Sequence, residues 1–190
     1  AEALDVAFID PANAGDADKP ASVTFGSPTF VSTGATLAAI DSDLGRLVDD
    51  LSNNGSNLGT AVWIMRPTTA ANIARVRGTG GAAAFPSITA KGGMLLGIPV
   101  LTSENVPIVG SPGTTSIVLL NADGVALADD GEATFDVARH ASVQMDDAPS
   151  SGAHQLVSLW QLNMVGLRAE RIVNWRVRRP GTAATLTGVT

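Results

Sequence analysis

Few residues in this sequence have side chains suited to catalysis or metal binding. Imidazoles occur only at His140 and His154, and carboxylates occur as adjacent pairs at 49/50, 129/130 and 146/147. His154 follows Asp146 and Asp147 closely, so a histidine base oriented by a carboxylate is one arrangement that the sequence offers. A small hydrolytic or ligand-binding domain that uses His154 with Asp146 or Asp147 is therefore one hypothesis.

The spacing of these residues argues against that chemistry. Neither histidine has a second histidine four residues away, no serine lies in a Gly-x-Ser-x-Gly motif, and cysteine is absent. Adjacent carboxylates do not converge by themselves, and none has the spacing of a calcium-binding loop. The glycines at 78–81 follow a helical pattern instead of a strand, which indicates a helix end and not a phosphate loop. The sequence thus predicts no catalytic residue, no cofactor and no metal site.

Composition narrows the possible partners. The 190 residues are 45% hydrophobic, which is ample for a core, and the net charge of -6 argues against sequence-specific nucleic-acid binding. No apolar run approaches the roughly 20 residues that span a bilayer, so no membrane partner is expected. Five of the twelve Lys and Arg residues nevertheless cluster near the C-terminus, at 168, 171, 176, 178 and 179. We expect them to pair with acidic neighbours in a sheet or in a subunit contact.

The segment 164–178 is the element that must hold most of these arginines. Its residues alternate between an apolar set and a charged set, and only Arg171 interrupts the apolar one. Period-two alternation predicts one long strand of about 45 Å with one buried face. On that face we expect Val165, Leu167, Val173, Trp175 and Val177, and on the other Arg168, Arg176 and Arg178.

The rest of the chain predicts an α+β fold. Helical spacing of apolar residues predicts a helix over 36–51, and a second helix should start at Thr68 or Thr69. Continuous apolar runs at 61–65 and 116–120 predict buried strands, the first of them central. The run 92–107 suits an edge strand or a bend, 182–187 predicts a short return strand, and the alternating segments after 123 predict an antiparallel meander. All three tryptophans are expected in the core.

Three stretches, in order along the chain, resemble one known family. The segment 63–73 places an apolar strand before Arg-Pro-Thr and a short helix. The segment 93–107, GMLLGIPVLTSENVP, is similar to a family pattern G-x-L-x-G-x-P-V-x-x-S-x-x-x-P, and 167–183 resembles a long C-terminal strand with an Arg-x-x-Arg core and a final proline. These features resemble the major capsid proteins of tailed bacteriophages, which have the Hong Kong ninety-seven fold.

The resemblance implies an axial domain with a central sheet flanked by helices, over 29–124 and 182–190, and part of a peripheral domain with a long β-strand, over 1–28 and 125–181. It implies a structural subunit of a phage or prophage icosahedral capsid, located in the virion, and no enzyme. The partners would be copies of the chain in pentamers and hexamers, with a scaffold, maturation protease or portal. An encapsulin-like cargo shell is the alternative within the fold. The expected subunit contacts are Arg168, Glu170, Arg171, Arg176 and Arg178.

The chain opens without methionine inside an apparent helix, which predicts a piece of a longer protein. The resemblance implies that an N-terminal arm and an extended loop supply much of the shared contact area in such shells. We therefore expect these 190 residues alone to be a monomer or a weak oligomer.

Overall fold

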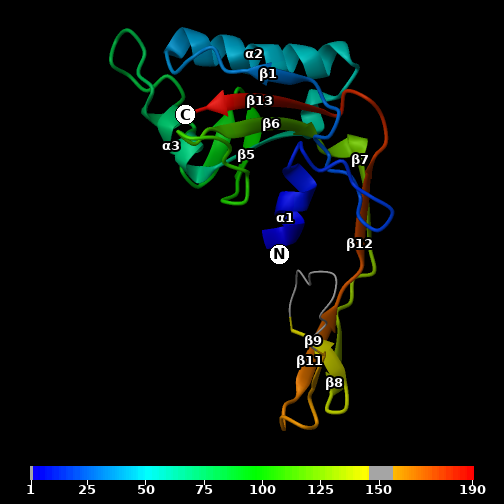
Figure 1. Ribbon diagram of the computed structural model, residues 1–190. Helices are drawn as coiled ribbons and strands as arrows, with labels where there is room; N and C mark the ends of the chain where they lie inside the picture. Colours follow the sequence, from blue (N-terminus) through cyan, green and yellow to red (C-terminus); the bar gives the residue numbers. More distant parts are fainter. Residues whose placement is uncertain (1, 146–155) are drawn as a thin grey trace. The chain divides into compact units, whose positions relative to one another are not determined.

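The computed structural model describes residues 2–145 and 156–190, and the chain divides into two compact units (Figure 1). The first unit comprises Ala1–Leu127 and Trp175–Thr190, and the second comprises Ala128–Asn174. The helices of the described residues all lie in the first unit, whereas the described part of the second unit contains only strands and turns. The α+β class predicted from the sequence is confirmed.

A seven-stranded mixed sheet forms the first unit. Its order is β1-β13-β6-β2-β5-β4-β3, with parallel pairs β1/β13 and β2/β5 and antiparallel pairs elsewhere. β2 lies at the centre, as its continuous apolar run predicts. The strands are β1 (Thr29–Val31), β2 (Ala61–Met65), β3 (Ile88–Thr89), β4 (Gly92–Leu95), β5 (Ile98–Thr102), β6 (Thr115–Asn121) and β13 (Ala183–Val189).

The helix α2 (Leu37–Asn53) packs on β13 and β6. It begins after Thr36, whose hydroxyl accepts a hydrogen bond from the Ala39 backbone N–H at 3.3 Å. Leu44, Leu47 and Leu51 are buried on its inner side. The apolar spacing of the sequence therefore predicted both this helix and the side that it buries.

The helix α3 (Pro67–Arg75) lies beside β3. Its N-cap is Arg66 and Pro67 occupies the first turn, so the predicted threonine cap is wrong. Proline is favoured there because its fixed φ suits a helix start and its missing N–H would have no helical partner. Thr69 is instead buried in the first turn of the helix.

One core joins the two helices to the sheet. Trp63 of β2 is fully buried within it, and its indole N–H donates to the Leu95 carbonyl at 3.0 Å. The helix α1 (Glu2–Ile9) belongs to the same unit, and its Phe8 meets Trp175 edge to face with ring centroids 5.3 Å apart. Two short 3-10 turns, Leu58–Thr60 and Ala122–Gly124, precede β2 and the strand β7 (Val125–Asp129).

The predicted edge strand or bend over 92–107 is a hairpin inside the sheet. β4 pairs with β5, and the turn between them places Leu96 and Gly97 at positive φ, 52° and 78°. β5 also pairs with β2, so it is internal, and the edge is β3. Pro99 is accommodated there opposite Met94 in the β4/β5 register.

The predicted meander is instead a set of nested strand pairs. β8 (Thr134–Ala138) pairs with β11 (Gly166–Glu170), and β9 (Ser142–Gln144) pairs with β10 (Leu156–Ser158), both antiparallel. β7 (Val125–Asp129) and β12 (Val173–Val177) form a third two-stranded sheet. β7 and β8 thus each pair with a returning strand far along the chain, whereas β9 pairs with the next strand, β10.

The single long strand predicted over 164–178 is wrong, because the structure has two strands there, β11 and β12. Arg171 and Ile172 separate them, while the facing segment 130–133 between β7 and β8 is longer and contains Gly131 at φ 75°. Segments of unequal length cannot keep one ladder in register, so the pairing stops and restarts.

The predicted burial is wrong in part as well. Trp175 is 6% exposed, and Val173 and Val177 are half-buried, but Val165 and Leu167 are exposed. Arg168, Arg176 and Arg178 are exposed as expected. Among the described residues, no helix is long and apolar enough to cross a bilayer.

Candidate functional site

The histidine hypothesis concerns residues that the structure does not describe. Asp146, Asp147 and His154 lie outside the described residues. His140 is exposed, and its ring stacks on Trp160 with centroids 5.1 Å apart. Trp160 is 67% exposed, so the prediction that it lies in the core is wrong. Within 2–145 and 156–190 no group of three or more His, Asp or Glu side chains could hold a metal ion.

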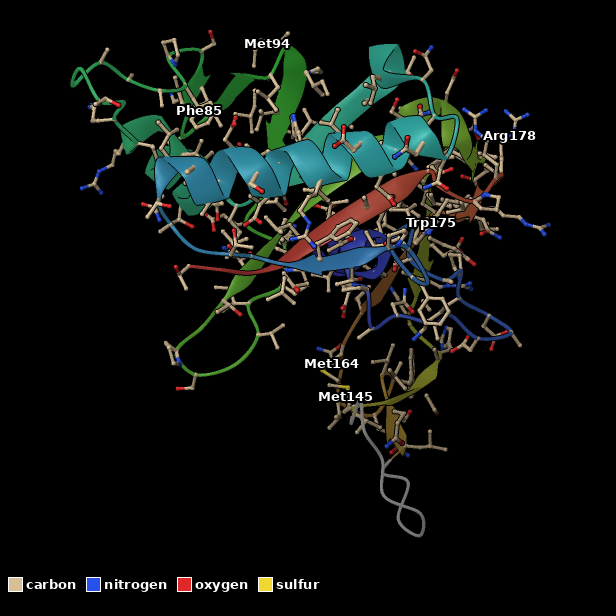
Figure 2. The ribbon with its side chains drawn as sticks, turned by 90° about the horizontal axis from the view of Figure 1, so that it is seen from above. Phe85, Met94, Met145, Met164, Trp175 and Arg178 are labelled. Carbon is tan, nitrogen blue, oxygen red and sulfur yellow. The ribbon has the colours of Figure 1, made fainter. Side chains whose placement is uncertain are left out.

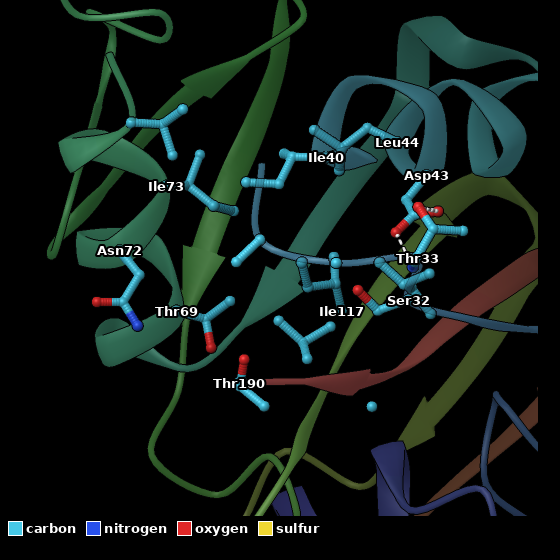
Figure 3. A pocket seen from close by; sticks show the side chains of 16 residues that line it. Ser32, Thr33, Ile40, Asp43, Leu44, Thr69, Asn72, Ile73, Ile117 and Thr190 are labelled. Atoms are coloured by element: carbon cyan, nitrogen blue, oxygen red, sulfur yellow. Dashed lines mark hydrogen bonds between the residues drawn. The ribbon is translucent and has the colours of Figure 1, made fainter. Parts of the chain in front are cut away.

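A cavity of about 390 Å³ lies in the first unit, between α2, α3 and the end of β13 (Figure 3). Among the described residues of its wall, Asp43 is the one titratable side chain. That carboxylate accepts hydrogen bonds from the Thr33 backbone N–H at 2.7 Å and the Thr33 hydroxyl at 3.0 Å, and Arg46 lies 3.7 Å away. Because Asp43 is committed to tying the segment before α2 to the helix, the cavity has no free acid or base for catalysis.

Two of the expected contact arginines are paired within the second unit. Arg168 pairs with Glu170, and Arg171 forms a two-pronged pair with Asp129, with Nε to Oδ1 at 3.0 Å. The Arg171 guanidinium, followed by the Gly131 backbone N–H, holds the pKa of Asp129 below its usual 3.8, and the same hydrogen bond raises the pKa of Arg171. The pair fixes the junction where β11 ends.

The other two expected contact arginines belong to the first unit. Arg176 and Arg178 are exposed, and neither forms an ion pair with a described residue. Figure 2 shows Arg178 at the periphery of this unit. The Arg178 backbone N–H donates to the Gly124 carbonyl at 2.8 Å, which anchors the main chain and leaves the side chain available for another molecule.

The β8/β11 ladder has one apolar face and one charged face. Directly opposed pairs share a face, and Val137 opposes Leu167 just as Phe135 opposes Ala169. Phe135 and Val137 are each 67% exposed and Leu167 is 71% exposed. The alternating residues, among them Arg168, lie on the other face. We call Phe135, Val137, Leu167 and Ala169 the apolar ribbon face.

This surface was missed from the sequence, although the signal was present. Phe135 and Val137 alternate with polar neighbours, as Leu167 does in β11, and such alternation indicates one apolar face. The alternation in 164–178 predicts a buried Leu167, and it does not reveal that Phe135 and Val137 share its face. Further exposed apolar side chains of the second unit lie at Val143, Met145, Leu156, Trp160, Leu162, Val165 and Ile172.

Comparisons with known proteins identify the family. A model of the phage capsid family matches residues 2–188. The capsid polyprotein of Pseudomonas phage PAJU2 is 41% identical over 194 residues, which cover 99% of this chain and 28% of that protein.

Solved capsid structures share the fold. The capsid of a native GTA particle aligns over 100% of this chain and 61% of that chain, with TM-score 0.62 and 17% identity. A chain of Mycobacterium phage Bobi aligns over 97% and 60%, with TM-score 0.67 and 11% identity. An encapsulin from Synechococcus elongatus PCC 7942 aligns over 99% and 61%, with TM-score 0.57 and 16% identity. The chain therefore spans less than two thirds of these relatives, and it belongs to the phage capsid family.

Proposed function

We propose that this chain is part of a structural subunit of a phage or prophage capsid. Copies associate into pentamers and hexamers of an icosahedral shell that encloses the genome, and the mature protein resides in the virion. Membership of the phage capsid family and the 41% identity to a phage capsid polyprotein support this function.

The observation that favours self-association most directly is the apolar ribbon face. A two-stranded ladder is marginally stable in water by itself, and it gains stability when its apolar face is covered. Burying one Val, Leu or Phe side chain contributes about 1.5–3 kcal/mol. Phe135, Val137 and Leu167 are mostly exposed, so a second copy that covers them would stabilise both the ladder and the shell.

The parts of the subunit follow from the resemblance to capsid proteins. The axial domain is proposed to comprise 29–124 and 182–190, and the peripheral domain 1–28 and 125–181. Arg168, Glu170, Arg171, Arg176 and Arg178 are the proposed polar subunit contacts, and their exposure supports that role. Arg176 and Arg178 are the stronger members, since neither pairs with a described carboxylate.

We also propose that the subunit is not an enzyme, and that a scaffold, maturation protease or portal joins it during assembly in the host cytoplasm. An encapsulin-like cargo shell is the second function within the fold. The encapsulin likeness is at 16% identity and bears on fold alone, whereas the phage relative is 41% identical, so the phage capsid is favoured.

Electron microscopy of the full-length protein tests the function. We expect closed shells of uniform size, with nucleic acid inside when they are purified from phage-producing cells. Protein cargo in place of nucleic acid would favour the encapsulin alternative. Dispersed protein without shells across a range of salt and protein concentrations would contradict the proposal.

A matched pair of variants tests the apolar ribbon face. Leu167→Gln places a polar group on it, whereas Ala133→Gln places the same group in the exposed segment before β8. We expect Leu167→Gln to lower the yield of shells and Ala133→Gln to leave it unchanged, with both proteins folded by circular dichroism. Equal yields would show that this face is not a contact.

A further inference from the structure

The first unit separates its charges by sign. α2 carries Asp41, Asp43, Asp49 and Asp50 against a single cation, Arg46. The whole stretch 67–103, from α3 through β5, contains three charged residues, and all are basic: Arg75, Arg77 and Lys91. We call the exposed carboxylates of α2, Asp41 and Asp49, the acidic flank. Arg75, Arg77 and Lys91 are the basic flank.

These charges are available to another molecule. Asp41 and Asp49 are exposed, in contrast to Asp43, which is buried and held by Thr33. Arg75, Arg77 and Lys91 are exposed, and none forms an ion pair with a described residue. Neither flank therefore neutralises the other within one copy.

α2 and α3 line the same cavity, and the topology places the two flanks toward opposite edges of the sheet. α2 packs on β13 and β6, toward the β1 edge, whereas α3 packs beside β3, the strand at the other edge. Figure 2 looks down on α2 and shows Phe85 and Met94 on one side of it and β1 on the other. Met94, Leu96 and Leu101, in the hairpin that follows Lys91, are exposed as well.

We propose that the acidic flank of one copy contacts the basic flank of the next copy, head to tail. This inference rests on the proposed function and identifies the surfaces that close its rings. A ring requires two different, complementary patches on each subunit. Opposite charges satisfy that requirement, whereas a two-fold contact through either flank would oppose like charges.

Charge reversal in the full-length protein tests the pairing. Asp49→Arg and Arg77→Asp each oppose like charges, so each lowers the assembly rate at low salt by about tenfold. The double variant restores opposite charges and recovers most of the rate. Asp18→Arg makes the same charge change as Asp49→Arg, but in an exposed bend. It controls for the net charge of that variant and leaves assembly near the wild-type rate. Additive losses in the double variant would overturn the proposal.

Chemical cross-linking tests the head-to-tail direction of the contact, and it does not require shells. The chain lacks cysteine, so Asp49→Cys and Arg77→Cys each introduce a unique thiol into the described chain. With a bis-maleimide reagent we expect linked pairs when the two variants are mixed and none from either alone. Homodimers from one variant alone would overturn the head-to-tail contact.

Two further outcomes separate the proposals from each other. Shells that form without any mixed cross-link would refute the flank contact and leave the capsid function intact. The second outcome is that Arg77→Asp loses bound nucleic acid while the Asp49→Cys and Arg77→Cys proteins give no mixed cross-link. That result would assign the basic flank to nucleic acid and would also refute the contact.

Discussion

At the residue scale, Trp63 tests the core of the first unit. Its ring is fully buried, and its indole N–H donates a hydrogen bond to the Leu95 carbonyl. Trp63→Phe therefore leaves a cavity and a carbonyl acceptor without its donor. We expect a loss of about 2–4 kcal/mol in the free energy of unfolding. Urea titration followed by the helical circular dichroism signal measures it, because the described helices belong to the first unit.

Trp160→Phe is the matched control for Trp63→Phe. Trp160 is mostly exposed and belongs to the second unit, so the change should stay within about 0.5 kcal/mol. A comparable loss in both variants would mean that the core assigned around β2 is incorrect.

The Arg171–Asp129 pair gives a prediction about pH. The folded state lowers the pKa of Asp129, chiefly through the Arg171 hydrogen bond, so its stabilisation is present above the unfolded value of 3.8 and is lost as pH falls through the folded value. Arg171→Gln should raise the pKa of Asp129 toward the usual value. Titration of the side-chain carboxyl ¹³C shift by NMR checks this, and an unchanged midpoint in the variant would exclude Arg171 as the cause.

At the element scale, the β3/β4 pairing depends on Gly93. Its φ is 135°, and a Cβ there would lie 2.1 Å from the Ser87 carbonyl oxygen, which accepts the Met94 N–H at 2.9 Å. Gly93→Ala should therefore cost about 2 kcal/mol or more. Thermal unfolding is the measurement, and Gly80→Ala is the control, since nothing lies within 4 Å of its Cβ. Equal melting temperatures for the two variants would contradict the strained geometry.

The elements that the sequence predicted well are those whose pattern depends on local burial. α2 shows a clear helical period and β2 a continuous apolar run, and both elements pack into the same core. The ladder partners were not predictable in the same way. β8 pairs with β11 across a long stretch of chain, and short alternating strands fit a meander or nested pairs equally well.

The interrupted strand shows a limit of alternation as a signal. Leu167 and Trp175 have the same parity, yet Leu167 is mostly exposed and Trp175 is buried. Alternation reports which side chains are apolar, and burial requires another element to cover them. Within the first unit Trp175 meets Phe8 and donates to the Ala21 carbonyl at 2.8 Å, which the local sequence around 164–178 could not reveal.

At the scale of the whole molecule, the sequence suggests the proposed arginine contacts more readily than the proposed apolar contact. Clustered exposed charge is visible in one segment, whereas the apolar ribbon face requires the β8/β11 register before its four members come together. The flanks of the first unit require the strand order as well, because α2 and α3 reach opposite edges only through it. Contacts of this kind can therefore be proposed only after the fold is known.

The last prediction concerns these 190 residues expressed by themselves. They correspond to about 60% of the solved capsid chains and 28% of the curated relative, so chains of those full lengths have further surface that these residues do not supply. The remaining contact should be of the small, transient class, below roughly 1,200 Å², and the net charge of -6 adds repulsion between copies at low salt. Light scattering over a range of concentrations should show a monomer or a weak, concentration-dependent oligomer. A stable closed particle would show that the apolar ribbon face and the two flanks suffice for assembly.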